Sequence, residues 1–233
     1  MSEFLFDEFS PVSAQEWKQK IQMDLKGADY NETLIWNTLE GIDVRPFYHS
    51  EGPTTKPMSI PGIPNLWNIT NEVFIDNESV AHSLTLNAIK RGADAILFIA
   101  DKEFNATEVF KDFPYSKATI YLQLNFLSKE FLMKLDHHMA VSKATVYYRI
   151  DILGNLLQTG NWHHNLNEDH TVLDHFYKSA KNNNILGVDL SIYQNAGANM
   201  TQQLAYGMAH MNEYLNHFNS LDLLKNFKPT FTV

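Results

Sequence analysis

Three polar residues directly follow apolar runs of the sequence, at points where a β/α protein would bind a ligand. Asp101 follows AILFIA, Asn125 follows ATIYLQL and Asp151 follows TVYYRI. In parallel β/α folds the carboxyl ends of the strands form the mouth that holds ligands, and carboxylates there can carry acid–base chemistry. Each residue could instead cap the helix or loop that follows it, and capping is the commoner role of such residues. The sequence leaves both interpretations open.

The ten histidines raise the question of a metal site. His210, Glu213 and His217 fall at i, i+3 and i+7 on one face of a predicted helix, a spacing that permits zinc binding. A solvated or interface face explains the same spacing, so we predict no metal site. His137–His138 and His163–His164 are adjacent pairs whose side chains diverge, and we expect them in loops or on the surface.

Several motifs that would specify an activity do not occur. The sequence has no GxGxxG, GxxxxGK[ST] or GxSxG, and it has no cysteine for a thiolate nucleophile or a cysteine-ligated metal. Asp136 and His138 imitate the D-x-H-x-x-G pattern that presents a histidine to cobalt, but Val141 stands where the glycine is required. We treat this match as coincidence.

Short apolar runs alternate with helical periodicity from Val80 onward. The predicted strands lie at residues 95–100, 118–124, 145–150 and 185–193, and FKPTFTV resembles the start of another. Continuous apolar strands bounded by helices predict a parallel sheet. We therefore expect an α/β fold, either a (β/α)8 TIM-barrel-type domain or a doubly wound sheet. A closed barrel needs eight strands and only five or six candidates are present, which predicts an open fold or a truncated barrel.

Two predicted helices of this region carry clear signals. Ser128 precedes an apolar stretch as a cap. The stretch 195–218 predicts a long helix, and its expected buried stripe consists of Leu204, Met208, Met211, Leu215 and Phe218.

The first 66 residues differ in pattern from the rest. Phe4, Leu5, Phe6 and Phe9 have no evident local partners and predict an arm that packs against another surface. Ser13 and Glu16 have capping-box spacing, and the helix that they begin should stop at Gly27. A strand is expected around Ile42 and Val44, before the proline-rich stretch GPTTKPMSIPGIPN. We assign 1–66 as an arm and subunit-contact region and 67–233 as the partial barrel.

Composition narrows the functional classes. The 233 residues have a formal net charge of −9 that is spread along the chain, which argues against nucleic-acid or anionic-membrane partners. No stretch reaches the ~18 apolar residues of a membrane span. The acidic amino terminus does not resemble an export signal, so we expect a cytoplasmic protein.

Several segments together resemble methylmalonyl-CoA mutase subunits. They are LKGADY, EGIDVRPFY, the region of Trp67 and Ile69, and NAGANMTQQLAYGMAHMNEYL. The resemblance extends over nearly the whole sequence but over only about half of a full-length subunit of that family. It implies an eight-stranded barrel followed by a B12-binding-like domain.

The resemblance also marks the pocket positions and shows them changed. Catalytic subunits read W-T-I-R-Q-Y where this sequence has Thr70 in place of the arginine and Glu72 in place of the tyrosine. The family's Q-N-D-I-L has Arg149 and Asp151 at its first and third positions, and Ile192 replaces a histidine that polarises the thioester carbonyl. Thr70 cannot hold a carboxylate in bidentate fashion, and Ile192 cannot donate a hydrogen bond. We predict no catalytic residue here and only a degenerate pocket.

The resemblance therefore implies the small, non-catalytic subunit. Such a chain pairs with a large catalytic subunit that binds adenosylcobalamin and the acyl-CoA, and it binds no cofactor itself. Radical chemistry belongs to the coenzyme, so a barrel can lose its site and still support its partner. Two alternatives stay open: a non-catalytic acyl-CoA-binding module, and a free-standing β/α enzyme that uses Asp101, Arg149 and Asp151.

Overall fold

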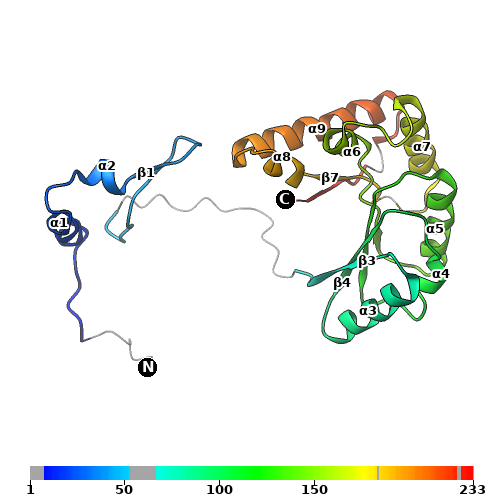
Figure 1. The fold of residues 1–233 in the computed structure, drawn as a ribbon, viewed down its shortest axis with the longest axis horizontal. Helices are drawn as coiled ribbons and strands as arrows, with labels where there is room; N and C mark the ends of the chain where they lie inside the picture. The colour runs from blue at the N-terminus through cyan, green and yellow to red at the C-terminus, as the bar shows by residue number, and fades with distance from the viewer. Residues whose placement is uncertain (1–7, 53–66, 183, 225–226, 233) are drawn as a thin grey trace. The chain divides into compact units, whose positions relative to one another are not determined.

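Figure 1 shows a computed structural model of the chain, which describes residues 8–52, 67–182, 184–224 and 227–232. The chain divides into two units, Met1–Pro64 and Asn65–Val233, and each is described by itself. The first contains helices and strands with the following bounds: α1 Ala14–Asp24, α2 Tyr30–Leu34, β1 Trp36–Asn37 and β2 Asp43–Val44. The second contains the remaining helices and strands, with these bounds: β3 Thr70–Phe74, α3 Glu78–Lys90, β4 Ala95–Ala100, α4 Ala106–Val109, β5 Thr119–Leu124, α5 Lys129–Val141, β6 Val146–Tyr147, α6 Ile152–Thr159, α7 Leu166–Ser179, β7 Gly187–Asp189, α8 Ser191–Asn195, α9 Met200–Ser220 and β8 Thr230–Thr232.

The first unit forms local structure without a buried core among its described residues. The predicted capping box begins α1, because the Ser13 hydroxyl accepts from the Glu16 N–H and the Glu16 carboxylate accepts from the Ser13 N–H. The expected strand near Val44 is β2, which pairs antiparallel with β1. No described residue of this unit is buried. Phe4, Leu5 and Phe6 lie outside the described residues, as does most of the proline-rich stretch.

The second unit is built on parallel strands, as predicted. The order β3-β4-β5-β6 forms one parallel sheet, and β7 pairs parallel with β8. The two groups are joined by a parallel bridge between Ile150 and Leu186, and the Tyr148 N–H donates to the Asn184 carbonyl over 2.8 Å. Six strands therefore follow one another side by side. The α/β prediction is confirmed.

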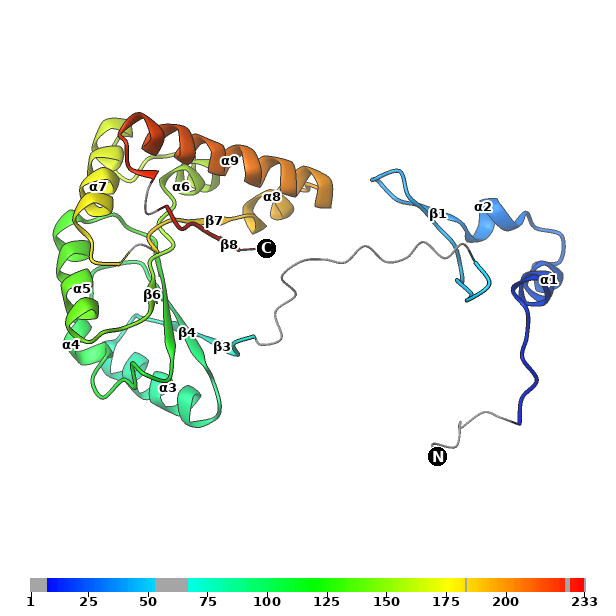
Figure 2. The same ribbon diagram turned by 180° about the vertical axis from the view of Figure 1, so that it is seen from behind.

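The helices cover one face of this sheet. Alternate strand residues such as Val73, Ile96, Phe98, Ile120 and Leu122 are buried in the core that α3, α4, α5 and α7 enclose. Figures 1 and 2 show these helices along the outer side of the strands. The inner face is more open and carries cross-strand rows, one of which consists of Glu72, Leu97, Tyr121 and Tyr147. The Tyr121 and Tyr147 rings stack there, with their centroids 4.9 Å apart.

Three strand predictions need correction. Of the predicted strand 145–150, only β6 (Val146–Tyr147) forms a regular strand. Arg149 has a left-handed backbone (φ 43°) that breaks regular pairing. The predicted strand 185–193 ends at Asp189, whose carboxylate accepts from the Ser191 N–H as α8 begins. The strand β3 was missed, because its residues are mostly polar and exposed.

The buried stripe of α9 was also predicted wrongly in part. Met211 and Phe218 are buried, but Leu204 and Met208 are exposed and Leu215 is half-buried. The residues that complete the buried face are Gln203, Gly207, His210 and Tyr214. The prediction from hydrophobicity failed because this face of α9 packs against Asp151, with which His210 and Tyr214 interact through hydrogen bonds.

Candidate functional site

A cavity of about 90 Å³ opens at the carboxyl ends of β5, β6, β7 and β8. The residues of its wall that bear on chemistry are Gln123, Arg149, Asp151, His163, Asp189 and Ile192. This position agrees with the general rule that ligands of parallel sheets bind at the carboxyl ends of strands. Ligand pockets of drug-sized molecules have roughly 300–1,000 Å³, so this cavity is small.

The structure brings together three of the five pocket candidates. Arg149, Asp151 and Ile192 line the cavity, and so does Asn125. Asp101 is not part of the wall, but its carboxylate accepts from the Asn125 amide over 2.7 Å.

The other two candidates lie elsewhere. Thr70 pairs with Ala95 at the amino ends of the strands, and Glu72 stands two pairs further along β3, opposite Leu97. Both are exposed, and neither lines the cavity. Three strand spacings of about 4.8 Å each separate β3 from β6, so these two residues lie far from Arg149 and Asp151. The five candidates therefore do not form one site.

Asp151 serves both as a helix cap and as part of the cavity wall. Its Oδ1 accepts from the Gly154 N–H of α6 over 2.8 Å, which fulfils the capping interpretation. The same oxygen lies 2.9 Å from Nε2 of His210 and accepts from the Tyr214 hydroxyl over 2.8 Å. Tyr193 completes the cluster, with its hydroxyl 3.0 Å from Nδ1 of His210. One carboxylate thus ties α6 to α9, and His210 extends the cluster to α8 through Tyr193.

The cluster is strongly enclosed. The His210 side chain is 2% exposed and that of Asp151 is 12% exposed. Burial, and next the Asp151 charge, raise the pKa of Tyr214 well above its usual value, so this hydroxyl stays a donor. Oδ2 of Asp151 has no hydrogen-bond partner among the described residues and lies against Gly154, where a Cβ would collide with it. Gly154 therefore makes room for the carboxylate.

The backbone at Arg149 is strained. A left-handed conformation costs a residue with a Cβ roughly 1–2 kcal/mol. Gly187 lies so close that a Cβ on it would stand 2.7 Å from the Arg149 Cα. The chain therefore keeps Arg149 in an unfavourable conformation, with a glycine on the neighbouring strand to allow it.

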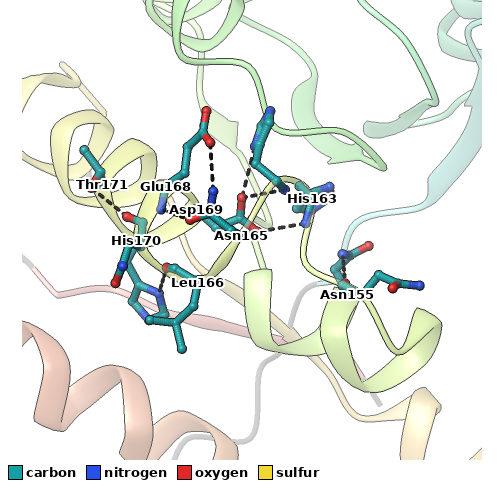
Figure 3. A network of polar contacts seen from close by, with 11 residues as sticks. Asn155, His163, Asn165, Leu166, Glu168, Asp169, His170 and Thr171 are labelled. Atoms are coloured by element: carbon teal, nitrogen blue, oxygen red, sulfur yellow. Dashed lines mark hydrogen bonds and ion pairs between the residues drawn. The ribbon is translucent and has the colours of Figure 1, made fainter.

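Asp169 fixes the loop that brings His163 to the cavity (Figure 3). Its carboxylate is fully buried and accepts from the backbone N–H groups of His163 and His164, over 2.8 and 3.0 Å. Nδ1 of His164 lies 3.0 Å from the same carboxylate. The expectation that the His163–His164 pair occupies a loop is confirmed, but the place of His163 in a cavity wall was not foreseen.

Acid should destabilise the protein partly through its histidines. Burial lowers the pKa of His163 and of His138, so the folded chain holds them neutral where the unfolded chain binds protons. Their contribution to stability is present above about pH 6.5, the value for a free histidine, and is lost as the pH falls through the folded pKa. We expect urea unfolding to show this decline, and His163→Gln to make it shallower. An equally steep decline in the variant would contradict this account.

The histidines of α9 do not form a metal site in the described part of the chain. His210 is held by Asp151, and Nε2 of His217 lies 2.6 Å from the Asp174 carboxylate. Glu213 is exposed. No three described His, Cys, Asp or Glu side chains are placed to hold one ion.

Asp136 and His138, the two residues that imitate a cobalt-ligand motif, are both held by contacts within the protein. Asp136 is buried and accepts from the Tyr148 hydroxyl and the Lys181 N–H. Nε2 of His138 lies 3.1 Å from the Tyr115 hydroxyl, so this side chain is engaged within the protein. Both residues have structural partners.

Comparison with known proteins gives one distant relationship. No family model matches the chain. The methylmalonyl-CoA mutase small subunit of Porphyromonas gingivalis (strain ATCC BAA-308 / W83) is 34% identical over 112 residues, which cover 43% of this chain and 18% of that protein. The match thus spans less than a fifth of the relative, and it relates the chain to this family at a distance. No helix of the described residues has the length and hydropathy needed to cross a bilayer.

Proposed function

We propose that this chain forms part of the small, non-catalytic subunit of an adenosylcobalamin-dependent methylmalonyl-CoA mutase. A large partner subunit would bind adenosylcobalamin and the acyl-CoA and carry out the interconversion of methylmalonyl-CoA and succinyl-CoA. This chain would support that partner. The distant relationship to a small subunit and the parallel β/α fold favour this assignment.

One observation carries the non-catalytic part of the proposal. Ile192 lines the cavity at the strand ends, where the resemblance places the family's carbonyl-polarising histidine. A hydrocarbon cannot donate the hydrogen bond that stabilises charge on a thioester oxygen, and removing one such donor typically costs 10²–10³ in turnover.

The free-standing enzyme is less well supported. Oδ1 of Asp151 already has three partners, and Asp101 lies outside the cavity wall. Because Oδ2 of Asp151 is buried against Gly154, neither carboxylate is placed to exchange protons with a substrate beside Arg149.

The first unit offers apolar side chains to a partner. Trp36, Leu39, Ile42 and Tyr48 are 58–88% exposed, and the unit has no buried residue of its own among those described. Large exposed apolar surface commonly marks protein–protein contacts. We assign the surface of these four residues to the contact with the large subunit.

Co-purification with the large mutase subunit of the same organism tests the assignment. Trp36→Asp should weaken the complex at least tenfold, because it places a charge in an apolar contact, roughly 1.4 kcal/mol or more. Gln19→Asp adds the same charge at an exposed polar position and should leave assembly unchanged. Thermal unfolding of the isolated variants should match that of the wild type.

Two results would overturn the proposal. The first is undiminished assembly of the Trp36→Asp variant. The second is rearrangement of methylmalonyl-CoA by the purified chain with adenosylcobalamin but without the large subunit.

A further inference from the structure

The cavity at the strand ends is lined by an arginine that forms no ion pair with the described residues. Arg149 is half-buried in its wall and makes no hydrogen bond or ion pair with the described residues. The two carboxylates of the same wall have other donors. Asp151 is held by α6 and α9, and Asp189 accepts from the Ser191 N–H over 2.9 Å. The donors of the Arg149 guanidinium are thus unused by the described residues.

Further donors without partners face the same space. The side chains of Gln123 and His163 line the cavity and make no hydrogen bond with the described residues. Gln123 and Arg149 each lie two residues beyond the last pair of the β5–β6 ladder, Tyr121 and Tyr147. Neutral histidine and glutamine can each donate one or more hydrogen bonds. The cavity therefore offers several donors to one acceptor-rich group.

The fold keeps this arginine in place at a cost. Its left-handed backbone is unfavourable, and Gly187 provides the space that the conformation needs. Strain of this kind persists where the surrounding structure enforces it, and it clusters at ligand-binding positions. The conformation supports a binding role for the guanidinium.

The rest of the wall sets the size and charge of the ligand. Leu127, Leu132 and Ile192 give the cavity an apolar side. Its volume of about 90 Å³ is well below the roughly 300–1,000 Å³ of pockets for drug-sized molecules, so we expect a small ligand. Asp151 and Asp189 add negative charge to the wall and disfavour a dianion more strongly than a monoanion, and Arg149 can pair with one carboxylate.

We propose that this cavity binds a short-chain monocarboxylate as a free acid, with the carboxylate on Arg149 and the hydrocarbon against Ile192. A planar guanidinium holds a carboxylate through two parallel hydrogen bonds. This inference goes beyond the scaffold role, since a supporting subunit needs no small-molecule ligand. It does not involve the surface around Trp36.

NMR of the arginine side chains tests the proposal directly. The sequence has three arginines, so the Nε–Hε signal of Arg149 can be assigned by its loss in Arg149→Lys. Titration with propionate should shift this signal to saturation and leave those of Arg45 and Arg91 in place. Propionamide, which has the same shape without the charge, should bind at least tenfold more weakly.

Variants separate binding from folding. Arg149→Gly should abolish propionate binding, measured through the NMR signals of Gln123 and His163, which also line the cavity. Its melting temperature should not fall, because glycine accepts the left-handed backbone. Arg91→Gln removes the same charge outside the cavity and should bind propionate as the wild type does.

Other outcomes would overturn the assignment. Equal shifts with propionamide, or propionate binding by Arg149→Gly, would show that the carboxylate does not bind Arg149. Inorganic phosphate binding as tightly as propionate would show a general anion site, and propionyl-CoA binding as tightly would show that the free carboxylate is not recognised. Complex formation with the large subunit is measured separately, so a failure here leaves the scaffold proposal intact.

Discussion

Replacing Asp151 by alanine is expected to lower the free energy of unfolding by about 3 kcal/mol, because buried donors lose their acceptor. His210 and Tyr214 would both be left without this partner, and α6 would lose its cap. Urea unfolding followed by circular dichroism measures the change. The matched control is Asp101→Ala, which removes an exposed carboxylate at the corresponding end of β4 and should cost less than about 0.5 kcal/mol.

The conservative variant Asp151→Asn separates charge from hydrogen bonding. An asparagine oxygen can still accept from the helix N–H and from Tyr214, so we expect a smaller loss than with alanine. Similar losses in Asp101→Ala and Asp151→Ala would contradict the cluster's role in joining α6 to α9.

Gly187→Ala is expected to destabilise the protein by about 2–3 kcal/mol through overpacking. The new Cβ would stand 2.7 Å from the Arg149 Cα, and backbone cannot rotate out of the way as a side chain can. Either β7 or the Arg149 segment must move, which should also disturb the cavity. Chemical unfolding gives the stability change.

Gly207→Ala provides the comparison within the same unit. Its Cβ would also meet a neighbour at 2.7 Å, but that neighbour is the Leu190 side chain, which can adjust. Alanine in a helix also gains ~1 kcal/mol over glycine, so the net loss should stay below about 1 kcal/mol. If Gly207→Ala proved the more harmful change, the close approach at Arg149 would not be the rigid contact described above.

Local patterns were sufficient for much of the fold. The run AILFIA coincides with β4, and Ser13 and Ser128 cap the helices expected to follow them. Errors arose where tertiary contacts override local preference. Arg149 breaks a strand that its β-prone neighbours favour, and β3 contains too few apolar residues to be recognised before its pairing with β4 is known.

The candidate site was predicted only in its outline. Asp151 could be located because it follows an apolar run, but His210 and Tyr214 lie 59 and 63 residues further along the chain. A buried histidine and tyrosine one turn apart on α9 were the available signal, and their exposure cannot be known without the fold. Thr70 and Glu72 were placed with the others by resemblance alone, and sheet register separates them from the cavity.

The interruption at Arg149 has a consequence for local opening of the second unit. On either side of it the strands have regular ladders, while few backbone bonds join Tyr148 and Ile150 to the segment before β7. Cooperative subunits of a fold tend to separate where such bonds are few. Amide protons of β7 and β8 should accordingly exchange with deuterated solvent sooner than those of β4 and β5. The hydrogen bonds by which Asp151 joins α6 to α9 should slow this opening.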